Sequence, residues 1–174
     1  MNVTVFGATG VVGQALLPLL AEHELTAVSR TAHDEVGARY VVADAASGDG
    51  VAAAVEHAHV VYYLVHSLGA RDFEEQDRAA AETVASAAAD AGVRQIVYLG
   101  GLGANDPDAS PHLRSRRETG ERLASAGVPV TNLRAAMIVG KGSAAFETIL
   151  GLVKRLGSRV DARSGNEVAE AVRP

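Results

Sequence analysis

The sequence contains no cysteine and no tryptophan, and only 4% of its 174 residues are aromatic. Without cysteine the chain has no disulfide, no thiolate metal ligand and no cysteine nucleophile. Apolar residues nevertheless make up 48% of the chain. We therefore expect a single domain whose core is built from valine, leucine and alanine.

Long apolar runs and clusters of like charge are also missing. No stretch reaches the roughly 20 apolar residues of a membrane-spanning helix, and no basic leader precedes the first predicted strand. The 16 basic and 21 acidic residues give a net charge of −5, and without a basic block this disfavours nucleic-acid binding. We expect a cytoplasmic protein with no membrane and no nucleic-acid partner.

A strand, a glycine turn and a helix start follow one another at residues 3–14, VTVFGATGVVGQ. Residues of high β propensity run into glycines at every third position, and apolar residues then recur at helical spacing. In a dinucleotide-binding turn the three glycines allow a sharp turn, close approach of a pyrophosphate, and close packing of helix on strand. We expect this turn to bind a dinucleotide at the helix N-terminus, although an ordinary βα turn is the alternative. The predicted cofactor-binding residues of the turn are Gly7, Thr9, Gly10, Val11, Val12 and Gly13.

The second predicted strand, residues 25–30, ends in Ser29 and Arg30. At this point of a dinucleotide-binding fold an acidic side chain accepts the ribose 2′-hydroxyl, whereas an arginine accommodates a 2′-phosphate. The first acidic residues, Asp34 and Glu35, lie in the loop beyond the strand. The sequence therefore favours NADP over NAD as the cofactor, with NAD still open and a solvated arginine as the alternative.

Two further strand ends carry polar side chains suited to a cofactor. Asp44 ends the predicted strand 40–44, and it either hydrogen-bonds the adenine or caps the following turn. His66 follows the almost wholly apolar strand 59–65, whose composition is typical of a central strand covered on both faces. Open parallel sheets bind ligands at the carboxyl ends of their strands. His66 is therefore predicted to touch cofactor or substrate, with a structural histidine as the alternative.

The rest of the chain continues the alternation of strands and helices. The remaining helices and strands are predicted at 71–91, 95–99, 112–126, 129–134 and 144–156. An alanine-rich stripe along the first of these helices, through Phe73, Ala80, Val84, Ala87 and Ala91, indicates either packing on its own sheet or a homodimer. The alternation predicts an α/β fold with a parallel sheet of about six strands. We assign residues 1–156 to one domain and residues 157–174 to a polar tail.

Five motifs together resemble one group of the short-chain dehydrogenase/reductase superfamily. They are GATGVVG at 7–13, YLVHS at 63–67, YLGGLG at 98–103, HLRSR at 112–116 and LRA at 133–135. Over residues 1–156 the chain is similar to the atypical, NmrA-like NAD(P)H-binding proteins, which include relatives of the complex I NAD(P)H-binding accessory subunit. The resemblance implies a Rossmann-like, doubly wound sheet with the strand order 3-2-1-4-5-6.

The resemblance also places the catalytic positions of the superfamily. Catalytic members carry a serine or threonine after the fifth strand and a Tyr-x-x-x-Lys pair on the next helix, where tyrosine donates a proton and lysine holds the nicotinamide ribose. In this chain Gly100-Gly101 stands at the hydroxyl position, His112 at the tyrosine and Arg116 at the lysine. Histidine can donate a proton near neutral pH and arginine can bind a ribose. A charged helix end is the alternative for both.

These residues leave two functions open. The first is an NADP-dependent oxidoreductase that acts on a small carbonyl substrate, with His112 as the acid and Arg116 on the ribose. The second is a non-catalytic dinucleotide sensor, or a redox-responsive regulatory or assembly partner, which the missing serine, tyrosine and lysine favour. The superfamily builds much of its substrate pocket after the sixth strand, where this chain is short. We therefore expect weak or absent activity.

Overall fold

The computed structural model describes residues 1–33, 37–67, 72–136, 138 and 144–160. The chain divides into two compact units, Met1–Ala136 and Met137–Pro174. The strands of the first unit are β1 (Asn2–Phe6), β2 (Glu24–Ser29), β3 (Arg39–Val42), β4 (Val60–Tyr63), β5 (Gln95–Gly101) and β6 (Val130–Ala135). Its helices are α1 (Val11–Leu16), the 3-10 helix η1 (Leu17–Leu20), α2 (Val51–Val55), α3 (Phe73–Asp90) and α4 (Pro111–Ala124).

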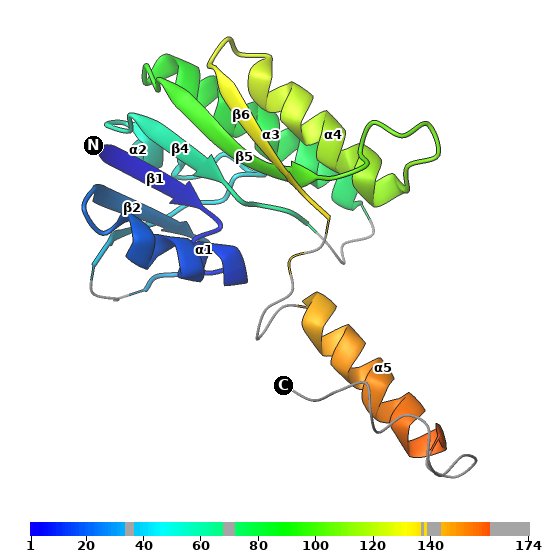
Figure 1. The fold of residues 1–174 in the computed structure, drawn as a ribbon. Helices are drawn as coiled ribbons and strands as arrows, with labels where there is room; N and C mark the ends of the chain where they lie inside the picture. The colour runs from blue at the N-terminus through cyan, green and yellow to red at the C-terminus, as the bar shows by residue number, and fades with distance from the viewer. Residues whose placement is uncertain (34–36, 68–71, 137, 139–143, 161–174) are drawn as a thin grey trace. The chain divides into compact units, whose positions relative to one another are not determined.

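The six strands form one parallel sheet in the order β3-β2-β1-β4-β5-β6 (Figure 1). This confirms the predicted fold class and strand order. β1 lies inside the sheet, where Phe6 is in register with Val28 of β2 on one side and with Tyr63 of β4 on the other. The strand order reverses between β1 and β4, and open parallel sheets bind their ligands beyond the carboxyl ends of the strands at such a switch point.

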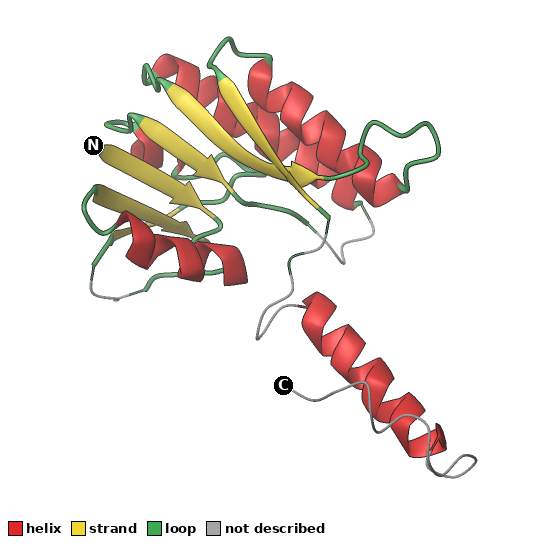
Figure 2. Cartoon of the chain, in the orientation of Figure 1, coloured by secondary structure: helices red, strands yellow, loops and turns green. Residues whose placement is uncertain are grey.

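Helices cover both faces of this sheet (Figure 2). On one face Val3 and Val5 pack in a cluster with Leu17 and Leu20 of η1. On the other face α2, α3 and α4 bury a larger cluster, whose biggest side chains are Tyr63, Tyr98, Phe6, Ile96 and Leu123. The helix changes from α1 to the 3-10 helix η1 next to Pro18, because proline has no N–H for the helical ladder.

The alanine-rich helix α3 packs on its own sheet. Ala80 and Val84 are buried as predicted, but Ala87 and Ala91 are only half-buried. The stripe that faces the core runs instead through Ala81, Ala85 and Ala88, and it includes the carboxylate of Asp77. Burial of the stripe within one chain supports the first of the two alternatives, and the homodimer stays a prediction.

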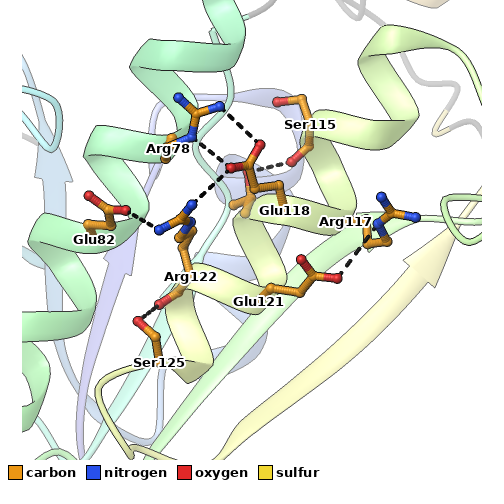
Figure 3. A network of polar contacts seen from close by, with 9 residues as sticks. Arg78, Glu82, Ser115, Arg117, Glu118, Glu121, Arg122 and Ser125 are labelled. Carbon is orange, nitrogen blue, oxygen red and sulfur yellow. Dashed lines mark hydrogen bonds and ion pairs between the residues drawn. The ribbon is translucent and has the colours of Figure 1, made fainter.

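Charged side chains on α3 and α4 form a connected network (Figure 3). Glu118 accepts hydrogen bonds from Nε of Arg78 at 2.7 Å and from Arg122 at 3.2 Å, and Arg122 also reaches Glu82 at 2.8 Å. The network joins α3 to α4 along their exposed sides. The spacing of charges within α4 alone does not predict these contacts between helices.

Helical spacing within α4 predicts three ion pairs: Arg114 with Glu118, Arg117 with Glu121, and Glu118 with Arg122. Two of them are present. Arg117 and Glu121 lie 3.6 Å apart, and Glu118 pairs with Arg122. The third expectation, a pair between Arg114 and Glu118, was wrong. Arg114 donates instead to the carbonyl of Ala109 at 2.7 Å, while Glu118 is already held by Arg78 across the helix interface.

This network makes the contribution of Glu118 to stability depend on pH. The hydrogen bond from Arg78 is the main reason why the pKa of Glu118 lies below its ordinary value. A carboxyl with a lowered folded-state pKa stabilises the fold above its unfolded-state pKa, and this stabilisation is lost as the pH falls through the folded-state pKa. Because these side chains are partly exposed, we expect Glu118→Gln to lower the free energy of unfolding at neutral pH by about 1 kcal/mol or less.

Urea unfolding of the Glu118→Gln protein at neutral pH and near pH 3 measures this effect. The difference from the unmodified chain should shrink at the acid pH, because the native carboxyl is then increasingly protonated. Glu121→Gln is the matched control, since the Glu121 side chain is 66% exposed and, among the described residues, its one ion pair is with Arg117. An equal loss for Glu118→Gln at both pH values would show that shape, and not charge, is responsible.

Apart from Ile138, the described part of the second unit is helix α5, Ala144–Val160. It begins where the sequence predicts and continues past the expected end at Leu156. Ile149, Leu152 and Val153 are exposed on it. Within the described parts of both units, no helix has the length and apolar character needed to cross a membrane. The boundary after residue 156 stays a prediction.

Candidate functional site

The carboxyl ends of β1, β2 and β4 and the segment after β3 enclose a pocket of about 460 Å³, a size usual for sites that bind small molecules. The predicted cofactor residues that line it are Gly7, Thr9, Gly10, Ser29, Arg30, Asp44 and His66. A larger open groove of about 690 Å³ lies between α2 and α3, and none of the predicted cofactor-binding or catalytic residues lines it. The pocket at the strand ends is therefore the candidate site.

The glycine turn has the backbone that its sequence predicts. Gly7 has φ +81, and a Cβ at this position would lie 3.1 Å from the backbone of Leu64. Gly10 donates its N–H to the carbonyl of Gly7 at 3.1 Å and precedes the first turn of α1, with no side chain capping the helix. The amides at the start of a helix carry partial positive charge and suit an anion.

Gly13 lies beneath the turn. A Cβ on Gly13 would lie 2.4 Å from the carbonyl oxygen of Gly7, so the helix can approach the strand only because this side chain is absent. Val11, Val12 and Gly13 occupy the first turn of α1 and do not line the pocket. Their contact with a cofactor stays a prediction.

The end of β2 presents Ser29 and Arg30 to the pocket. Ser29 is buried, its hydroxyl accepts the N–H of Thr31 at 3.1 Å, and its carbonyl accepts the N–H of Ala43 at 2.9 Å. Arg30 is exposed, and among the residues that the structure describes no carboxylate lies within ion-pair distance of it. Asp34 and Glu35 lie outside the described residues. A fixed backbone thus carries an exposed guanidinium at the pocket wall.

The carboxylate of Asp44 is engaged in the turn that follows β3. Its Oδ1 accepts the N–H groups of Ala46 at 2.8 Å and of Ser47 at 3.3 Å, an arrangement typical of an aspartate that stabilises its own turn. The turn-capping alternative is therefore present in the structure. Asp44 also lines the pocket, and its hydrogen bond to adenine stays a prediction.

His66 is exposed in the segment after β4 and lines the pocket. The residues on either side of it are held by hydrogen bonds. The carbonyl of Val65 accepts from Arg116 Nη1 at 3.1 Å, and the N–H of Ser67 donates to Asp77 Oδ1 at 2.7 Å. Desolvation and the charge of Arg116 lower the pKa of His66, while Asp77 acts in the opposite direction.

Arg116 is almost fully buried, with 7% of its surface exposed. Besides Val65, its guanidinium donates to the carbonyl of Leu99 at the end of β5, and its Cζ lies 4.9 Å from the ring centre of Tyr98. The hydroxyl of Tyr98 donates back to the carbonyl of Arg116 at 2.7 Å, and burial raises the pKa of Tyr98 to about 12. Arg116 does not line the pocket, so its contact with a ribose stays a prediction.

His112 lies in the first turn of α4, which Ser110 caps by accepting the N–H of Leu113 at 3.3 Å. Among the described residues its Nδ1 is buried without a hydrogen-bond partner. Burial is the main cause that lowers the pKa of His112, with the charge of Arg116 second. The charge of His112 in turn acts on His66. The structure thus brings both histidines near the ends of β4 and β5, but only His66 lines the pocket.

Gly100 and Gly101, at the hydroxyl position, differ in how much room their neighbours leave for a side chain. A Cβ on Gly100 would lie 2.4 Å from Oδ1 of Asn132, and one on Gly101 would lie 2.7 Å from Cδ2 of Leu113. The Cβ on Gly100 would also lie 3.2 Å from the ring of the fully buried Tyr98, whereas Gly101 faces the end of a flexible leucine. The packing therefore disfavours a serine at Gly100 more than at Gly101.

Two polar residues of the site were missed by sequence reasoning. Gln76 lines the pocket, and Asp77 accepts the N–H of Ser67, which lines the pocket next to His66. One signal was available for Asp77. It lies three residues before Ala80 and seven before Val84, and a carboxylate at this helical spacing on an apolar stripe indicates a buried polar role.

A family model described as NAD(P)H-binding matches residues 7–147. A sequence search of curated proteins finds no match. Solved structures share the fold. The enzyme WbmH of Bordetella bronchiseptica in complex with NAD+ is 17% identical, with a TM-score of 0.75 over 90% of this chain and 63% of its own.

Two further solved structures are similar. The triphenylmethane reductase of Citrobacter sp. is 21% identical, with a TM-score of 0.68 over 80% of this chain and 50% of its own. The UDP-N-acetylglucosamine 4-epimerase of Bacillus cereus is 17% identical, with a TM-score of 0.67 over 82% of this chain and 55% of its own. The chain spans less than two thirds of the length of each of the three.

The matched residues contain the glycine turn, every predicted cofactor residue and the two predicted catalytic positions. The likeness to solved structures shows the fold. The family match in addition indicates that the chain binds a nicotinamide dinucleotide. The NmrA-like subgroup stays a prediction. The family match covers most of the chain and includes the pocket at the switch point of the sheet, and the chain therefore belongs to the NAD(P)H-binding family.

Proposed function

We propose that the pocket binds NADP(H) in preference to NAD(H), and that turnover of a small carbonyl substrate by this chain is weak or absent. The observation that carries the cofactor preference is the exposed guanidinium of Arg30 at the end of β2, in the wall of the pocket that begins at the glycine turn. This strand end is where dinucleotide folds recognise the adenosine ribose. An arginine there can form charge-assisted hydrogen bonds with a 2′-phosphate.

Replacing Arg30 by alanine tests the preference. The unmodified chain should bind NADPH more tightly than NADH in a fluorescence titration. In Arg30→Ala we expect NADPH to lose about 1.5–3 kcal/mol, which is roughly a 10- to 100-fold higher Kd. NADH has no 2′-phosphate, so its Kd should change little.

Arg39→Ala provides the matched control for this titration. Arg39 is also exposed, but it lies at the start of β3. It lines a different hollow, at the amino ends of the strands, away from the candidate pocket. Its removal changes the net charge of the chain equally and should leave both affinities unchanged. Tighter binding of NADH by the unmodified chain, or equal losses for both cofactors in Arg30→Ala, would contradict the preference for NADP.

The proposed chemistry requires a hydride from NADPH on the carbonyl carbon and a proton on the carbonyl oxygen. His112 is the proposed proton donor, because it stands at the tyrosine position and lies near His66. Gly100 and Gly101 supply no hydroxyl to the developing oxyanion, and loss of one such donor typically costs about 100-fold or more in rate.

A dinucleotide sensor is the second candidate function. Two observations favour it: the guanidinium of Arg116 is bound to backbone carbonyls of Val65 and Leu99, and Gly100 has little room for a hydroxyl-bearing side chain. A sensor keeps the cofactor pocket and needs neither group for chemistry. Cofactor oxidation with a panel of carbonyl compounds discriminates between the two functions.

A further inference from the structure

The backbone segment Val65–Ser67 is held from two helices by opposite charges. On one side of His66 the carbonyl of Val65 accepts from Arg116 of α4 at 3.1 Å, and on the other side the N–H of Ser67 donates to Asp77 of α3 at 2.7 Å. All three residues of the segment line the pocket. The guanidinium of Arg116 is therefore matched with a backbone carbonyl, and the carboxylate of Asp77 with a backbone N–H.

Asp77 also ties the two helices together. It is 3% exposed, and its second carboxylate oxygen, Oδ2, accepts the hydroxyl of Ser115 on α4 at 3.1 Å. Ser115 immediately precedes Arg116 in the chain, and Figure 3 shows it at the interface between α3 and α4. One carboxylate thus connects the pocket wall to the helix that carries Arg116.

Neither charge is neutralised directly by the other. Among the ion pairs of the described residues, none joins Asp77 to Arg116. A buried charge is costly unless hydrogen bonds satisfy it, and here the backbone of residues 65–67 provides part of that satisfaction. Charge-assisted hydrogen bonds are about twice as strong as neutral ones, so the same contacts hold the segment in place.

We propose that Asp77 and Arg116 are positioning residues, which fix the backbone on both sides of His66 and so set the wall of the pocket formed by Val65–Ser67. The identity of the ligand that benefits, a nicotinamide dinucleotide, rests on the proposed function. The placement of the segment does not rest on it. Asp77 acts through Ser67 and Ser115 and touches no ligand itself.

Amide hydrogen exchange in the cofactor-free protein tests the placement. Asp77→Ala removes both hydrogen bonds, and we expect the Ser67 amide to exchange at least roughly tenfold faster. In Asp77→Asn the amide oxygen can still accept from Ser67, so exchange should stay close to that of the unmodified chain. Thr83→Val is the matched control, because it removes a hydrogen bond of the same helix, from Thr83 to the carbonyl of Ala79, away from the segment.

Two readouts separate positioning from a general loss of stability. The Kd for NADPH should rise roughly tenfold in Asp77→Ala and recover in Asp77→Asn, while Thr83→Val leaves it unchanged. The pKa of His66, followed by NMR, should fall in Asp77→Asn, because the negative charge that raises it is removed while Arg116, which lowers it, remains. A variant that merely destabilises the fold would not shift this pKa.

The outcomes are distinct. Unchanged exchange of Ser67 in Asp77→Ala overturns the inference, as does faster exchange without any loss of NADPH affinity in a chain that binds NADPH. If the unmodified chain binds neither NADPH nor NADH, the proposed function fails, while the Ser67 exchange and the His66 pKa still decide whether Asp77 positions the segment. Faster exchange with weaker binding, both restored by asparagine, supports the inference.

Discussion

Gly13→Ala is expected to destabilise the chain by about 3 kcal/mol, whereas Gly10→Ala should fold and bind dinucleotides more weakly. The added Cβ on Gly13 would lie 2.4 Å from the carbonyl oxygen of Gly7 and 2.5 Å from that of Ala8. Both neighbours are backbone atoms of the turn that joins β1 to α1, so they cannot move without opening the packing of helix on strand. Urea unfolding of the two variants measures the difference.

Gly10 is the matched position three residues earlier. A Cβ there has a single near neighbour, the carbonyl oxygen of Gly7 at 3.3 Å, and its φ of −75 suits any residue. We expect Gly10→Ala to lower the free energy of unfolding by about 1 kcal/mol or less. The exposed methyl group would nevertheless stand where a pyrophosphate approaches the turn.

Binding of both NADPH and NADH should therefore weaken in Gly10→Ala by about tenfold or more, since the pyrophosphate is common to the two. This differs from Arg30→Ala, which should affect NADPH alone. If Gly10→Ala binds both cofactors normally, the pyrophosphate is not bound at this turn. A Gly13→Ala protein as stable as the unmodified chain would contradict the close packing.

Carbonyl reduction with NADPH is expected to be at least about 100-fold slower than at a site with a hydroxyl donor for the oxyanion. His112→Phe should abolish the activity that remains and spare NADPH binding, because phenylalanine occupies similar space but has no proton to give. The measurement is the oxidation of NADPH with a panel of small aldehydes and ketones.

His57→Phe is the control for this substitution, since His57 is exposed and lines the hollow at the amino ends of the strands, away from the candidate pocket. The pH dependence has a defined sign. Burial and Arg116 lower the pKa of His112 below its ordinary 6.5, so the imidazole is neutral at pH 7 and must gain a proton to act as the acid. Activity should therefore rise as the pH falls toward that lowered pKa.

The result decides between the two functions. Ordinary enzymatic rates that His112→Phe abolishes, with NADPH affinity intact, would refute the sensor. NADPH binding without any oxidation by the whole panel would refute the oxidoreductase. Activity that survives in His112→Phe would show that another group donates the proton, and His66 in the pocket wall would be the next residue to replace.

The fold and the glycine turn could be predicted from the sequence because they depend on local patterns. Apolar periodicity switches between strand and helix along the chain, and the turn between residues 7 and 13 needs glycine for reasons of backbone geometry alone. Helix ends and strand ends differed by a few residues from those predicted. Long-range packing decides where the last hydrogen bonds of an element form.

The site was predictable in part. Gly7, Arg30 and His66 line one pocket, as the sequence indicates, because the carboxyl ends of parallel strands meet at the same end of the sheet. This rule needs only the order of the elements, and the contact of these residues with a cofactor stays a prediction. The role of Asp44 was open between two alternatives, and its hydrogen bonds to Ala46 and Ser47 depend on how the following turn folds.

The sequence by itself determined that this protein has a parallel α/β sheet with a glycine turn after its first strand, because these features follow from periodicity and backbone sterics. Only the tertiary structure decided what the charged residues do. Arg116 and Asp77 are 39 residues apart in the numbering, yet both bind the segment around His66, and Glu118 pairs with Arg78 in preference to Arg114. The partner of a long charged side chain depends on the element packed beside it and on how deeply it is buried, and neither is encoded in local spacing.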